Sequence, residues 1–105
     1  MNASQLFLDK LNQLKKDFAA QLPLRLKAID AALQACRELP GDEARQQDLH
    51  RLLHSLGGTA GRFGFVQLGF DAHRIAAELT ALAQRDSWSE HDMAQIAQAL
   101  ALLKQ

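Results

Sequence analysis

The chain has 105 residues, of which 48% are hydrophobic and 23% charged, and its formal net charge at pH 7 is zero. This size and balance are typical of one small globular domain, and we expect residues 1–105 to form it. The absence of net positive charge argues against a partner such as nucleic acid or an anionic membrane. The one cysteine, Cys36, excludes an internal disulfide and is expected to be a small buried residue.

The amino-terminal segment lacks the pattern of a targeting signal. Charged residues such as Asp9 and Lys10 interrupt its apolar positions. Elsewhere, no apolar run approaches the roughly 20 residues of a membrane span. We therefore expect a cytoplasmic protein without a membrane partner.

Helix-forming residues dominate the sequence, and no stretch alternates apolar and polar residues with period two, so we expect an all-α fold. An amino-terminal cover helix is expected over about 4–20, with Ser4 as its N-cap. Its apolar face has helical spacing and comprises Phe7, Leu11, Leu14 and Phe18. Pro23 then either starts a new helix or kinks a continuous one.

The bundle itself is expected over about 23–104. Its first helix should end at Pro40-Gly41, because proline and glycine interrupt helices. Asp42 is placed to cap the following helix, which should end near Phe63-Gly64. The inward face of that helix is expected to carry Leu49, Leu52, Leu53, Leu56, Ala60 and Phe63.

Two further helices complete the expected bundle. One should run over about 66–85, and Ser87 and Glu90 have the spacing of a capping box that opens the last helix. Because the linkers are short, neighbouring helices should be antiparallel. The sequence therefore predicts an antiparallel four-helix bundle with an additional amino-terminal helix that extends or covers one end.

A histidine and several glycines occur together in the helix that follows Asp42. Each interior glycine costs about 0.5–1 kcal/mol relative to alanine, so a helix accepts a run of them only for a reason. We infer that the reason is access, because small residues one turn beyond His54 leave its imidazole open to a large partner. The glycines concerned are Gly57, Gly58 and Gly61.

On a helical wheel, His54 lies beside the leucine stripe rather than on it, so its ring should be at least partly exposed. A neutral imidazole, which is well populated near neutral pH, is a nucleophile. Phosphoryl transfer to such a ring needs mainly positioning and nearby positive charge. Arg51 and Arg62 are placed to supply that charge.

The pattern His54-x-Leu56-x-Gly58-x-Ala60-Gly61-x-Phe63-Gly64-Phe65 resembles the signature of histidine-containing phosphotransfer (HPt) domains of two-component phosphorelays. The order of the helices is also similar, so the resemblance spans essentially the whole chain. It implies a phosphorelay carrier that accepts a phosphoryl group on His54 from a receiver aspartate or a histidine kinase. The carrier then passes the group to a receiver domain.

The resemblance also implies a phosphotransfer intermediate rather than an independent kinase. The chain needs no cofactor of its own, because the response-regulator receiver domain supplies the Mg²⁺. We expect a monomer. The alternative is a non-transferring adaptor bundle that docks a receiver domain.

One position departs from the family pattern. Many HPt domains have a lysine three residues after the histidine, where it neutralises phosphate, and this chain has Gly57 there. This departure leaves the charge of the phosphate to be balanced by another group, and Arg51 or Arg62 is the candidate to substitute for the lysine.

A second group of candidates lies beyond the turn at Gly64. Two antiparallel helices place residues at similar distances from their turn beside one another. His73 and Arg74 should therefore lie near His54, and they are expected to border the site. Chemotaxis-kinase members of the family similarly have a second histidine at this distance, with a glutamate one turn on. This chain has Ala76 at that position.

Phe70 lies off the apolar stripe of its helix and is interpreted as a contact for a receiver domain. His50, one turn before His54, is either a solvated helix residue or a further partner contact. The two histidines have the spacing of half a metal site, but no Glu-x-x-His motif accompanies them. No metal site is expected.

Overall fold

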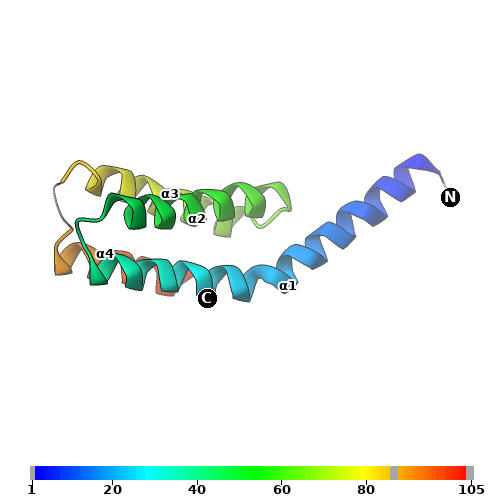
Figure 1. Cartoon of the computed structure of the whole chain (residues 1–105). Helices are drawn as coiled ribbons and strands as arrows, with labels where there is room; N and C mark the ends of the chain where they lie inside the picture. Colours follow the sequence, from blue (N-terminus) through cyan, green and yellow to red (C-terminus); the bar gives the residue numbers. More distant parts are fainter. Residues whose placement is uncertain (1, 86–87, 104–105) are drawn as a thin grey trace.

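The computed structural model describes residues 2–85 and 88–103, and all regular structure in these residues is helical. The four helices are α1 (Ala3–Glu38), α2 (Glu43–Arg62), α3 (Val66–Leu82) and α4 (Glu90–Leu103). Helices α1 and α3 each pack against both α2 and α4. Consecutive helices run in opposite directions (Figure 1), which confirms the prediction of a helical bundle for the described residues.

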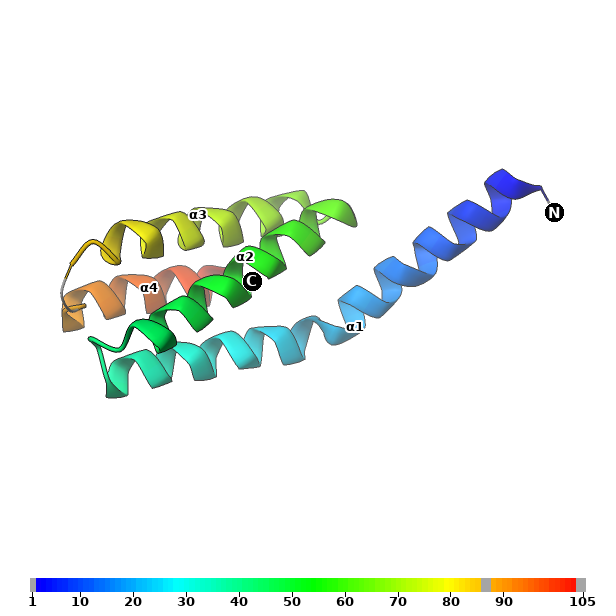
Figure 2. The same ribbon diagram turned by 45° about the horizontal axis from the view of Figure 1, so that its top comes forward.

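The separate amino-terminal helix predicted over about 4–20 is not found. One continuous helix of 36 residues, α1, contains Pro23 in its interior, and its two halves meet at an angle (Figure 2). A proline removes one backbone hydrogen bond and kinks a helix without having to end it, so the second of the two expectations for Pro23 is the correct one. The amino-terminal half projects beyond the bundle, and the molecule measures 57 × 23 × 21 Å.

The amino-terminal end of α1 also differs from the prediction. Its N-cap is Asn2 rather than Ser4, and the Asn2 side chain accepts a hydrogen bond of 2.8 Å from the backbone N–H of Gln5. The carboxyl-terminal end agrees with the prediction, because the helix stops at Glu38 with Leu39 as its C-cap, just before Pro40-Gly41. Asp42 caps α2 as predicted, because its carboxylate accepts the backbone N–H groups of residues 44 and 45.

A capping box opens α4, although not at the residues predicted for it. Ser87 lies outside the described residues, and the box is formed by Ser89 and Asp92. The Ser89 N–H donates to the Asp92 carboxylate at 2.9 Å, and the Asp92 N–H donates to the Ser89 hydroxyl at 3.0 Å. This hydrogen bond from Ser89, together with one from Arg85, holds the pKa of Asp92 below its ordinary value.

The hydrophobic core fills the space between the four helices. Cys36 is fully buried, as expected, and burial raises the pKa of its thiol. Of the inward face predicted for α2, Leu52 and Phe63 are only half-buried. The largest buried side chains are Ile29, Leu49, Leu53, Leu56, Ile75, Leu79, Met93 and Ile96. None of the helices among the described residues is long and apolar enough to cross a membrane.

Candidate functional site

Three histidines from two helices lie in a row along the contact between α2 and α3. His50 and His54 are one turn apart on α2, and their rings are nearly parallel with 6.1 Å between centroids. His73 of α3 inclines its ring at 67° to that of His54, with 5.3 Å between centroids. His54 and His73 are both exposed. The predicted exposure of His54 is thus confirmed, and so is the proximity of His73.

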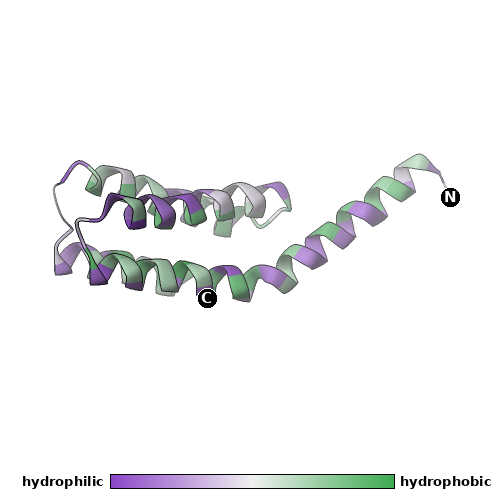
Figure 3. Ribbon diagram, in the orientation of Figure 1, coloured by the Kyte–Doolittle hydropathy of each residue, from purple (hydrophilic) through white to green (hydrophobic). Residues whose placement is uncertain are grey.

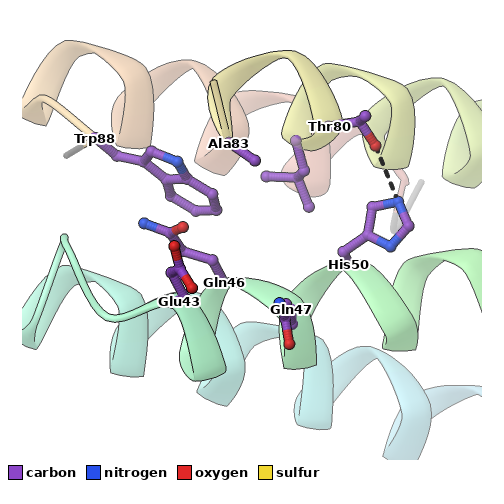
Figure 4. Close-up of a pocket in the computed structure, with 8 residues that line it drawn as sticks. Glu43, Gln46, Gln47, His50, Thr80, Ala83 and Trp88 are labelled. Carbon is purple, nitrogen blue, oxygen red and sulfur yellow. Dashed lines mark hydrogen bonds between the residues drawn. The ribbon is translucent and has the colours of Figure 1, made fainter. Parts of the chain in front are cut away.

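His50 is held more firmly than a solvated helix residue. It is half-buried, and its Nε2 lies 3.1 Å from the hydroxyl oxygen of Thr80 on α3 (Figure 4). The Thr80 hydroxyl donates its one proton to the Ala76 carbonyl at 3.1 Å. The Thr80 hydroxyl therefore links the His50 ring of α2 to the backbone of α3.

A hollow adjoins His50 toward the amino-terminal end of α2 (Figure 4). Sequence analysis missed this hollow, because Thr80 and Trp88 are far from His50 along the chain. The hollow is lined by Glu43, Gln46, Gln47, His50, Leu79, Thr80, Ala83 and Trp88.

Gly64 forms the turn that brings α3 back along α2. Its φ of 88° lies in the left-handed region, which glycine adopts without strain. The N–H of Phe65 donates to the Ala60 carbonyl at 2.8 Å, and the N–H of Gly64 donates to the Gly61 carbonyl at 3.2 Å. This pair of bonds is a Schellman motif, the common glycine-dependent end of an α-helix. It sets the direction of α3 and hence the position of His73.

The helical glycines near His54 meet different surroundings. A Cβ atom on Gly57 would lie 2.8 Å from Nε2 of the His73 ring, so the ring occupies the space where a side chain would begin. A Cβ on Gly69 of α3 would lie 2.9 Å from the backbone oxygen of Gly57 and 3.0 Å from the backbone nitrogen of Gly61. Gly58 and Gly61 face open space, with nothing within 4 Å of such an atom.

Access to His54 is therefore only part of the reason for the glycines. Gly58, one turn beyond His54, leaves open surface as expected. Gly57 instead makes room for His73, and the backbone of Gly61 lies against Gly69. The role of Gly69 was missed in the sequence, although a glycine inside an otherwise apolar helix is a signal of close backbone approach.

The three arginines expected near the site differ in how they are paired. Arg51 lies 2.5 Å from a carboxylate oxygen of Asp48, and Arg74 lies 3.8 Å from one of Asp71. Both are pairs along one helix with i, i+3 spacing. Arg62 is exposed and has no ion pair with any residue in the described part of the chain. Of these three arginines, Arg62 is therefore the one that has no carboxylate partner among the described residues.

A shallow hollow opens over the glycines beside the histidine row. Its rim carries Val66 and Phe70, which expose 72% and 66% of their surface. Exposed apolar side chains around a shallow hollow are typical of a contact surface. The exposure of Phe70 was predicted, whereas Val66 was missed. The hollow is lined by Gly57, Gly58, Gly61, Arg62, Val66, Gly69, Phe70 and His73.

No group of three or more His, Cys, Asp or Glu side chains within residues 2–85 and 88–103 is arranged to hold a metal ion. In comparisons with known proteins, no curated protein and no solved structure matches the chain. The family model of the Hpt domain matches residues 13–105, which include most of α1 and all of α2, α3 and α4. The chain therefore belongs to the Hpt-domain family, whose members carry phosphoryl groups on a histidine in two-component signalling.

Proposed function

We propose that this Hpt domain accepts a phosphoryl group on His54 and passes it to the aspartate of a receiver domain. The observation that supports His54 is its exposed ring beside the open surface at Gly58. His50 is half-buried and bound to Thr80, so it is less accessible to a partner. His91 is exposed on α4, outside the histidine row.

The chemistry needs little from the carrier except a positioned nucleophile. The unprotonated Nε2 of His54 attacks the phosphorus of a receiver's aspartyl phosphate while Nδ1 carries the ring proton. The N–P bond forms as the P–O bond to the aspartate breaks, and the aspartate leaves as a carboxylate. Transfer to a second receiver is the reverse reaction. Each receiver supplies the Mg²⁺ that neutralises the phosphate during transfer. A histidine kinase is a second possible donor of the phosphoryl group.

The phosphorylated ring needs a nearby positive charge, and the lysine that many family members have is replaced here by Gly57. The imidazole of His73 lies in the space that a side chain at Gly57 would enter, 5.3 Å from the ring of His54. A protonated His73 would therefore take the place of the lysine. Arg62, which has no carboxylate partner among the described residues, is the second candidate.

The receiver would dock over the shallow hollow beside the histidine row. Phe70 and Val66 offer it apolar contact area, and the absence of side chains at Gly58 and Gly61 lets its phosphorylated aspartate approach His54. His50 would support the site from the other side, because its ring lies parallel to that of His54.

The experiment mixes the chain with Mg²⁺ and a receiver domain that carries a radiolabelled aspartyl phosphate. The wild-type chain should gain acid-labile label, and His54→Gln should gain none. His91→Gln is the matched control, because it removes an exposed histidine of α4 and should leave labelling unchanged. Label that persists in His54→Gln would disprove the assignment. Binding of the receiver without labelling of the wild type would instead support the adaptor function.

A further inference from the structure

The projecting half of α1 has an apolar face that the described part of the chain leaves largely uncovered. Phe7 exposes 67% of its surface and Leu14 42%. Figure 3 shows hydrophobic and hydrophilic bands alternating along this half of the helix. The same face continues to Phe18, which is buried against Phe63 and Phe65 with ring centroids 6.0 and 5.2 Å away. The part of the chain that matches the family begins only at residue 13.

The spacing of this face points to a second helix as its occupant. Its apolar residues are separated by four, three and four positions, which is the heptad pattern of a two-stranded coiled coil. Leu11 and Phe18 then occupy a positions, and Phe7 and Leu14 occupy d positions. About 20 residues of helix precede Pro23, which is long enough for between two and three heptads.

The charges beside this face favour a second copy of the chain in the antiparallel orientation. Lys10 and Asp17 occupy successive g positions, and Lys15 occupies the e position between them. In a parallel pair, g positions face e positions, so Lys10 would face Lys15 of the second copy and repel it. In an antiparallel pair, g positions face each other, so Lys10 would face Asp17 of the second copy. Twofold symmetry repeats that attraction.

We propose that the chain forms an antiparallel homodimer through the projecting halves of α1. In the register that pairs a with d positions, Leu11 packs on Leu14 of the second copy. Phe7 then lies against the outer side of the aromatic cluster of Phe18, Phe63 and Phe65 of the second copy, because Phe18 is itself buried in that cluster. This assembly differs from the monomer expected from the sequence. It is independent of phosphoryl transfer.

Sedimentation velocity of the chain over a series of concentrations tests the dimer. The wild type should approach twice the monomer mass as concentration rises, and Phe7→Ser should remain a monomer with unchanged helix content, because Phe7 is exposed. Lys10→Asp and Asp17→Lys should each weaken the dimer by about tenfold, because two attractions become repulsions. An equimolar mixture of these two variants should form a heterodimer, since both Lys–Asp contacts then reform.

The matched control is Lys16→Asp, which makes the same change of charge on the outer side of the helix and should leave the dimer unchanged. A wild-type chain that stays monomeric at every concentration would overturn the proposal. So would a dimer that Lys10→Asp strengthens, because that outcome indicates the parallel orientation. His54→Gln should dimerise like the wild type, so failure of the proposed function would leave this inference intact.

Discussion

The two halves of α1 carry similar apolar faces but differ in burial. After Pro23, residues such as Ile29 and Leu33 are buried where the helix packs against α2 and α4. Before Pro23, Phe18 is the one buried side chain among the described residues of the helix. Full burial of a large apolar side chain contributes roughly 1.5–3 kcal/mol. The comparison shows that hydrophobic spacing identifies the apolar face of a helix, but a neighbouring element is needed to turn that face into stability.

The largest effect should come from matched truncations in the two halves. Ile29→Ala should lower the free energy of unfolding by about 2–5 kcal/mol, because Ile29 is only 2% exposed and its removal leaves a cavity. Leu14→Ala, at a position 42% exposed, should cost less than about 1 kcal/mol. Urea unfolding in dilute solution measures both. Equal losses would show that the projecting half is packed as firmly as the bundled half.

Two glycines near the α2–α3 contact should respond in opposite ways to substitution, because Gly69 lies in a tight contact and Gly58 lies on an open surface. Gly69→Ala should destabilise the chain by about 1–3 kcal/mol, because the new Cβ would meet backbone atoms of α2 that cannot move aside. Gly58→Ala should stabilise it by about 0.5–1 kcal/mol, since the position is open and alanine favours a helix. Thermal unfolding of the two variants should therefore shift in opposite directions.

Acid pH should act on the bundle through Asp92. The Ser89 N–H and the Arg85 guanidinium hold the pKa of this carboxyl below its ordinary value. Its contribution to stability is therefore complete above the ordinary carboxyl pKa and is lost as pH falls through the lower, folded value. Asp92→Asn should be less stable than the wild type near neutral pH, and its stability should fall less on acidification. Urea midpoints measured across the acid range test this, and parallel pH profiles would contradict it.

The smallest expected effect on stability concerns Gly57. In Gly57→Ala the exposed ring of His73 has to move, because the new Cβ would lie 2.8 Å from it, but little packing is lost. If His73 balances the charge of the phosphorylated ring, phosphoryl transfer should slow by roughly two- to tenfold in both Gly57→Ala and His73→Ala. Ser55→Ala on α2 is the control for the rate. An unchanged rate in His73→Ala would remove this residue from the mechanism.

Much of the fold was predictable because its signals are local. The four helices, the cap at Asp42 and the turn at Gly64 all depend on residues within a few positions of one another. The proximity of His54 and His73 was predictable as well, because a short turn between antiparallel helices pairs residues equally far from it. Pro23 was ambiguous, since a proline is compatible with both a kink and a break.

The rest of the site depends on the distance between α2 and α3, which no local pattern reports. The bond between His50 and Thr80 and the contact of Gly69 with the α2 backbone both require the helices to be placed side by side. The position of the His73 ring, which fills the space where a side chain at Gly57 would begin, also requires the two helices to lie side by side.

The sequence by itself determined the all-helical class, the histidine pattern and the exposed position of His54, because helical periodicity and spacing within a turn are properties of neighbouring residues. Only the tertiary structure decided that α1 continues through Pro23 and that its first half projects beyond the bundle. Only the tertiary structure also placed the ring of His73 beside Gly57 and the backbone of α2 against Gly69. The physical reason is the same in each case: burial and close approach depend on which elements meet.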